Sequence, residues 1–205
     1  MTSESDILHI LFSILFLVFL FERGYFQSKA MRSSGELTKY REKKLSMALL
    51  ILTFVVAQAW VIGSFIFIIN PAFLAWTRLS LPPWTRWLGA VLAVTGMAVE
   101  FSTQLYLGRN YSTFLHVREE HSLITTGPYR YVRHPMYTAL VTAGTGLSLL
   151  SASWYFGLPF IALIAVIMFR IKREERAMIE KFGDEYIQYM QRTGRFLPSI
   201  RKKTD

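Results

Sequence analysis

Long apolar segments separated by charged loops limit what this sequence can fold into. A helix needs about 20 mostly apolar residues to cross the roughly 30 Å hydrocarbon core of a bilayer. Three segments lie near that length and a fourth is longer. The four are residues 7–21, 45–69, 87–107 and 135–169. The sequence therefore predicts an all-α integral membrane protein.

The fourth apolar segment is too long for one crossing. At 1.5 Å per helical residue it is just long enough for two short spans. Ser151-Ala-Ser-Trp154 is the natural place to divide it. We therefore expect about five transmembrane helices, of which the last two form a short helical hairpin.

The distribution of Lys and Arg tests this division, because these residues collect in cytoplasmic loops. Of the 23 Lys and Arg, seven lie between the first two segments, two between the second and third, four in the next loop, and ten after Phe169. Five spans with the N-terminus outside or lumenal place 21 of the 23 on the cytosolic side. A single fourth span would put the ten-charge tail outside, so the hairpin is favoured.

The net charge of +9 follows mostly from this topology and from attraction to anionic lipid headgroups. Membrane lipids are thus expected partners, whereas nucleic acid is not, and no obligate protein partner is evident. The first apolar segment follows Glu4 and Asp6 without a basic residue or an Ala-x-Ala site, which favours a retained anchor over a cleaved signal peptide. The absence of cysteine excludes disulfides and thiolate chemistry.

Two polar residues, Glu100 and Gln104, interrupt the third apolar segment four positions apart, so a helix places them on one face. A carboxylate inside a span is costly and normally faces the bundle interior or a water-filled cavity. A packing contact to another helix and a place in the reaction cavity are both compatible with this pattern. His116 and His121 are five apart, which is not the spacing of a helical metal-ligand pair, and we predict no metal site.

The loop that enters the fourth segment, residues 121–137, is unusually rich in polar groups. Pro135 suits the first turn of a helix, where its missing N–H costs nothing. The amides of that turn would point back into the loop and suit a carboxylate, including that of an amino-acid-like ligand. Alternatively, Arg133 and His134 reach the headgroups while the tyrosines anchor the interface.

Where the fifth span emerges, Arg170 and Glu174 lie four apart, so a continuous helix puts both on one face. They could form an ordinary surface pair or face a site. Met178, Phe182 and Tyr186 continue at four-residue spacing, which is typical of an amphipathic helix along the membrane surface, and Gly183 could bend it.

Together these motifs resemble the isoprenylcysteine carboxyl methyltransferase family, which is related to the phospholipid N-methyltransferases. The resemblance covers about residues 115 to 198. The residues that carry it are Leu123-Ile-Thr-Thr-Gly-Pro-Tyr129, Arg133-His-Pro-Met-Tyr137, Glu174-Glu175, Phe182-Gly-Asp-Glu-Tyr186 with Tyr189, and Arg195-Phe-Leu-Pro198.

The resemblance implies a membrane enzyme that binds S-adenosylmethionine in a cytosol-facing pocket and releases S-adenosylhomocysteine. It places Arg170 against the methyl acceptor, as the catalytic residue. A further cofactor contact falls where this chain departs from the family pattern, near His116 or Val117. The implied cofactor-binding residues are His121, Ser122, Leu123, Ile124, Tyr129, His134, Pro135, Met136, Tyr137 and Glu174.

On this interpretation, residues 1–108 form three N-terminal spans with a basic loop. Residues 109–205 form the catalytic region, in which the cytosolic loop and the amphipathic helix build the cofactor pocket. The expected reaction is methylation of a lipophilic carboxylate, such as the C-terminal carboxyl of a prenylated cysteine. Alternatives are N-methylation of an aminolipid and an NADPH-dependent membrane reduction. The expected location is the plasma membrane of a prokaryote or the endoplasmic reticulum of a eukaryote.

Overall fold

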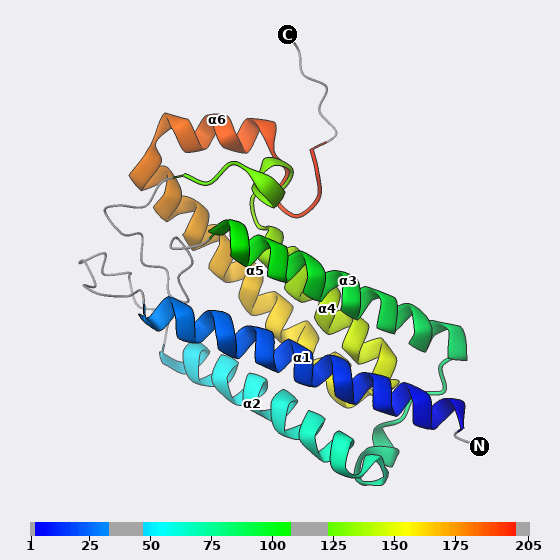
Figure 1. Cartoon of the computed structure of the whole chain (residues 1–205). Helices are drawn as coiled ribbons and strands as arrows, with labels where there is room; N and C mark the ends of the chain where they lie inside the picture. Colours follow the sequence, from blue (N-terminus) through cyan, green and yellow to red (C-terminus); the bar gives the residue numbers. More distant parts are fainter. Residues whose placement is uncertain (1–2, 33–46, 108–122, 200–205) are drawn as a thin grey trace.

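The computed structural model describes residues 3–32, 47–107 and 123–199, and most of them are helical. In these residues, helices α1 to α5 form a bundle, and the shorter helix α6 lies across one end of it (Figure 1). Two short 3-10 helices lie in the connections. The elements are α1 (Glu4–Arg32), α2 (Met47–Ile69), η1 (Pro71–Thr77), α3 (Pro83–Leu107), η3 (Gly127–Arg130), α4 (Pro135–Ser151), α5 (Trp154–Phe182) and α6 (Asp184–Arg192).

Within the part of the chain that the structure describes, three helices are long and apolar enough to cross a membrane, namely those that contain residues 4–29, 83–107 and 154–182. Many of their apolar side chains point outward, as expected when the solvent on that side is lipid. The all-helical prediction is confirmed for the described residues, and the apolar helices support an integral membrane protein. The total of five spans stays a prediction.

The turn between α4 and α5 falls at the predicted break. Ala152 takes the left-handed conformation, with φ 50°, and ends α4. Ser153 caps α5, because its hydroxyl accepts a hydrogen bond from the Tyr155 amide at 3.2 Å. The Ser153 and Thr77 hydroxyls are 2.6 Å apart and buried, so the turn is fixed to the end of η1.

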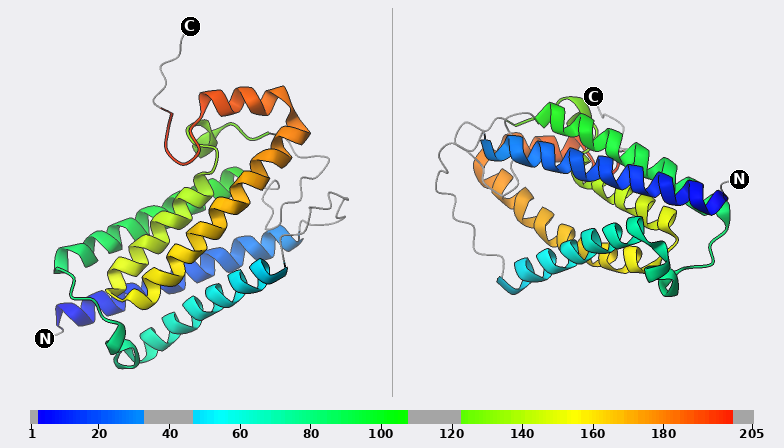
Figure 2. Two further views of the ribbon diagram at one scale, coloured as in Figure 1. Left: turned by 180° about the vertical axis from the view of Figure 1, so that it is seen from behind. Right: turned by 60° about the horizontal axis from the view of Figure 1, so that its bottom comes forward.

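α3 and α4 lie side by side along their length, and small residues let their backbones touch (Figure 2). A Cβ atom on Gly96 would lie 2.4 Å from the Ala143 nitrogen. One on Gly146 would lie 2.3 Å from the Ala93 nitrogen and 2.6 Å from the Gly89 oxygen. No flexible side chain can yield at these points. The pair forms a rigid wall that positions the start of α4.

We expect Gly146→Ala to lower the thermal unfolding midpoint in detergent, because the added methyl group must push two backbones apart. Overpacking of this kind typically costs about 1–3 kcal/mol. Gly157→Ala is the matched control, since a Cβ at Gly157 meets nothing within 4 Å. Equal midpoints for the two variants would show that α3 and α4 are not in close backbone contact.

An aromatic cluster joins α1, α2 and α5. The ring of Phe12 lies 5.0 Å from Phe67 and 5.4 Å from Phe156, centroid to centroid. Trp60 continues the cluster, 6.1 Å from Phe156 and 5.6 Å from Phe16. Since edge-to-face and tilted pairs fix ring positions, the cluster gives this part of the bundle a defined shape. Trp60 also faces the cavity described below.

Candidate functional site

The segment after α6 pairs with the segment before α4, although they are some 60 residues apart in the sequence. The Arg133 amide donates to the Gly194 carbonyl at 2.8 Å, and the His134 amide donates to the Arg195 carbonyl at 3.1 Å. The Thr138 hydroxyl donates to the Phe196 carbonyl at 3.0 Å. Two of the sequence motifs are therefore one structural unit, which holds the first turn of α4 in place.

Glu175 is the centre of this unit and is only 5% exposed. Its carboxylate accepts hydrogen bonds from Arg133 Nε at 3.2 Å and from Arg195, whose Nη2 lies at 2.5 Å and Nε at 3.1 Å. The His134 ring Nε2 lies 3.3 Å away. Arg133 also donates to the carbonyls of Met190 and Thr193. Buried charges need such partners, so these contacts lock α5, the start of α4 and the tail together.

α6 holds the 3-10 helix η3 against the same end of the bundle. The Tyr189 hydroxyl donates to the Tyr129 carbonyl at 2.6 Å. Burial raises the pKa of Tyr189 to about 12, so its phenol stays protonated and remains a donor at neutral pH. Gly127 begins η3 with φ +58°, and a Cβ there would meet the Tyr106 ring at 2.5 Å. The loop before α4 is thus tied to α3 and α6.

Three polar side chains meet where α4 and α5 cross. The Tyr137 hydroxyl donates to Glu174 Oε2 at 3.0 Å, and the Arg170 guanidinium lies beside that hydroxyl. Tyr137 is buried and packs with Ile167 and Ile171 of α5, which fixes the direction of its ring. The predicted common face of Arg170 and Glu174 is present on α5, and α4 supplies the third member of the group.

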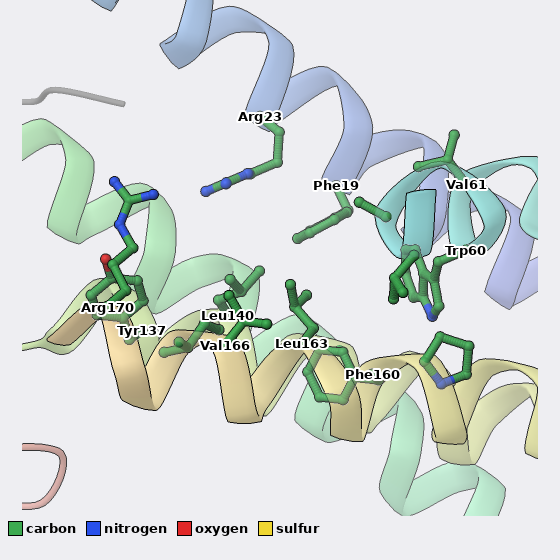
Figure 3. Close-up of a pocket in the computed structure, with 15 residues that line it drawn as sticks. Phe19, Arg23, Trp60, Val61, Tyr137, Leu140, Phe160, Leu163, Val166 and Arg170 are labelled. Atoms are coloured by element: carbon green, nitrogen blue, oxygen red, sulfur yellow. The ribbon is translucent and has the colours of Figure 1, made fainter. Parts of the chain in front are cut away.

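A cavity of about 300 Å³ begins at this polar group and extends into the bundle between α1, α2, α4 and α5. Arg170 and Tyr137 lie at one end, and Trp60 and Phe160 lie toward the other (Figure 3). Apart from the polar end and Arg23 of α1, the described lining is mainly aliphatic and aromatic. The arrangement suits an amphipathic molecule with a long apolar part and an anionic head.

The structure places the other predicted cofactor residues in several surroundings. Leu123 and Ile124 are partly buried ahead of η3, and Met136 packs against Phe26 of α1. The His134 ring is buried between Glu175 and Phe196, and Pro135 is buried at the first turn of α4. The cofactor roles of these residues stay predictions. Outside the described residues lie His116, Val117, His121 and Ser122.

Sequence reasoning did not foresee the role of Glu175. The Glu174-Glu175 pair was the available signal, because successive helical residues point about 100° apart and therefore contact different neighbours.

The predicted amphipathic helix is divided into two helices. Met178 and Phe182 belong to α5, and the chain turns at Gly183, with φ +53°, before Tyr186 on α6.

Residues 88–180 match the model of the isoprenylcysteine carboxyl methyltransferase family. The human protein-S-isoprenylcysteine O-methyltransferase is 27% identical over 130 residues, which are 62% of this chain and 45% of the human protein. The Saccharomyces cerevisiae protein of the same name is 30% identical over 116 residues, 55% of this chain and 48% of the yeast protein. This chain therefore spans about half the length of these curated relatives.

A solved structure of a eukaryotic intramembrane Ras methyltransferase, an isoprenylcysteine carboxyl methyltransferase, has a similar fold. The TM-score is 0.56 at 18% identity, and the match covers 91% of this chain and 67% of that chain. This likeness supports the fold. The family resemblance found in the sequence is confirmed for residues 88–180, because they match the model of the isoprenylcysteine carboxyl methyltransferase family and the curated relatives named above bear that name.

Proposed function

We propose that this protein is an S-adenosylmethionine-dependent methyltransferase that esterifies the carboxylate of a lipophilic acceptor, namely the C-terminal carboxyl of a prenylated cysteine. The observation that carries the proposal is the apolar cavity that ends at Arg170 and Tyr137. The names of the curated relatives support the same reaction.

The cavity fits the apolar part of such an acceptor. Its volume of about 300 Å³ lies at the lower end of the range for small-molecule sites. A prenyl chain that leaves water for this lining gains roughly 25 cal/mol for each Å² of apolar surface that it buries. Three of the four lining helices, α1, α2 and α5, expose apolar side chains on their outer sides, so the acceptor could enter sideways from the bilayer.

Arg170 would hold the carboxylate head of the acceptor. A guanidinium can donate two parallel hydrogen bonds to a carboxylate, which fixes its orientation as well as its position. The acceptor is already ionised at neutral pH, so it needs no strong general base. The protein's contribution is then to align the reacting oxygen and to exclude water from it.

The residues beside Arg170 fit a methyl donor that carries cationic groups and an amino-acid part. Glu174 offers a half-buried carboxylate, fixed by Tyr137, to an ammonium or hydroxyl group. The first turn of α4 begins at Pro135, so its amides point toward the loop and suit a carboxylate. Leu123, Ile124 and Tyr129 would add contacts from the loop. S-adenosylmethionine would supply an electrophilic methyl group at this place.

The proposed topology follows from the same arrangement. η3 and α6 lie at one end of the bundle (Figure 1), and the polar end of the cavity is near them, because Tyr137 lies in the first turn of α4. We place this end on the cytosolic side. Residues 1–108 would then supply the α1 and α2 walls of the cavity, and residues 109–205 would supply the α4 and α5 walls together with Arg170, Tyr137 and Glu174. α2 and α4 would complete five spans with α1, α3 and α5.

We expect Glu174→Gln to weaken donor binding about tenfold, because hydrogen bonds to a charged group are worth about 1.5–3 kcal/mol. Calorimetric titration with S-adenosylhomocysteine measures the change, and Glu185→Gln on the exposed face of α6 is the control. If Glu174→Gln altered only thermal stability, the carboxylate would serve as a packing contact to Tyr137.

The activity itself is tested with purified protein in lipid nanodiscs, methyl-labelled S-adenosylmethionine and N-acetyl-S-farnesylcysteine. The expected product is an ester that releases its label in mild base. Absence of transfer, with donor binding intact, would show that the acceptor is wrong. Thermal stabilisation by NADPH but not by S-adenosylhomocysteine would instead favour a reductase.

A further inference from the structure

A partly buried ion pair joins α1 to α3 beside the cavity. Arg23 Nη1 donates to Glu100 Oε1 at 2.6 Å, and the Gln104 amide donates to the same oxygen at 3.3 Å. These contacts account for the polar face that interrupts the third apolar segment. Glu100 thus contacts both Arg23 and Gln104, and the three side chains form one group.

The two charges of the pair are not equally buried. The Glu100 side chain is 0% exposed, whereas that of Arg23 is 32% exposed. Arg23 also lines the cavity, to which Glu100 contributes nothing. In Figure 3 the Arg23 side chain reaches in from α1, on the part of the cavity wall between Arg170 and Phe19. A pair that served packing alone would not need to present its cation to the cavity.

Placing the charged Arg23 side chain beside an apolar cavity costs free energy, because the charge loses contact with water. A charged side chain inside a membrane protein is expensive and usually marks a substrate or ion pathway. Glu100 compensates the charge of Arg23, and it also fixes one end of a fork that has five N–H donors. The Glu100 carboxylate therefore orients the Arg23 guanidinium.

We propose that Arg23 is a second residue that binds the carboxylate head of the acceptor and that Glu100 is its positioning residue. This inference rests on the proposed function and extends it to substrate selection. With Arg170 at the end of the cavity and Arg23 on its wall, two arginines bracket the place where the apolar lining stops. The site then selects lipophilic acids over neutral lipids of the same length.

Equilibrium binding tests this role without turnover. N-acetyl-S-farnesylcysteine and its uncharged carboxamide are titrated into the full chain in nanodiscs, with no methyl donor present. We expect Arg23→Gln to weaken binding of the acid about tenfold and to leave binding of the carboxamide nearly unchanged. Arg23→Lys should restore part of the preference for the acid. Arg192→Gln, an exposed cation on α6, is the matched control.

The variant Arg23→Gln leaves Glu100 buried without its cation and could fail to fold. The double variant Arg23→Gln/Glu100→Gln removes both charges and keeps two hydrogen-bonding side chains of similar size. We expect it to fold and still to lack the preference for the acid. Glu100→Gln alone should keep acid binding, because Arg23 remains, but lower kcat several-fold through loss of alignment.

If the folded double variant kept the wild-type preference for the acid, the pair would be a packing contact and the inference would be wrong. That result is distinct from a failure of the proposed function, in which the wild-type protein forms no ester whatever its binding preference.

Discussion

Replacing Arg170 with alanine should raise the KM for a prenylated carboxylate acceptor about 100-fold, because two charge-assisted hydrogen bonds are lost. Affinity for the methyl donor should change little, since Glu174 and the start of α4 are unaltered. The measurement is an initial-rate titration of the acceptor at saturating donor, combined with calorimetry of donor binding.

Two variants make this result specific. Arg170→Lys keeps the charge but loses the planar fork, so it should recover only part of the affinity for the acceptor. Arg173→Ala removes an exposed cation from the same helix and should leave KM near the wild-type value. If Arg170→Ala weakened donor binding and left KM unchanged, Arg170 would belong to the donor site.

Glu175→Gln should lower the free energy of unfolding by about 3–5 kcal/mol, because it leaves Arg133 and Arg195 without their shared buried carboxylate. Thermal or denaturant unfolding in detergent measures the loss. Hydrogen exchange supplies a local readout, since the amides of Arg133 and His134 donate to the tail and should exchange faster.

The neighbouring substitution Glu174→Gln is the matched control for this effect. Glu174 is half-buried and accepts from one tyrosine, so its loss should reduce stability far less than the loss of Glu175. Equal stabilities for the two variants, with unchanged amide exchange, would contradict the role of Glu175 in joining the tail to α4.

Features with a local cause could be predicted from the sequence. Apolar length and charge distribution located the helices, and they also located the turn between α4 and α5, which the structure places at Ala152 and Ser153. Four-residue spacing correctly placed Arg170 and Glu174 on one face of α5. These features depend on the helical repeat and on neighbouring residues, which a single sequence displays directly.

Features that depend on distant contacts could not be predicted. α1 continues to Arg32, beyond the expected end at Phe21, and Arg23 within that extension meets Glu100, which is 77 residues away. Glu175 binds Arg133 from the segment before α4 and Arg195 from the segment after α6, which are distant in the sequence. The backbone contact at Gly146 is likewise invisible without knowledge of which helices are neighbours.

The predicted cofactor-binding residues also include some whose neighbours could be predicted and some whose neighbours could not. Tyr137 and Glu174 were both predicted, and the structure brings them within hydrogen-bonding distance. His134 was predicted beside them, and its ring lies 5.8 Å from the Tyr137 ring, but it also contacts Glu175 and Phe196. Its predicted contact with a cofactor stays a prediction. A motif shows that residues belong together without showing which atoms face the ligand.

Carboxyl methylation by this protein is tested most directly with S-farnesylcysteine, which offers a free amine and a carboxylate in one molecule. The purified chain is incubated with methyl-labelled S-adenosylmethionine, and mass spectrometry locates the transferred methyl group. We expect a base-labile methyl ester and an unmodified amine, with the yield greatly reduced in Arg170→Ala. A base-stable N-methyl product would contradict carboxyl methylation, because it would place the amine, and not the carboxylate, at the reacting position.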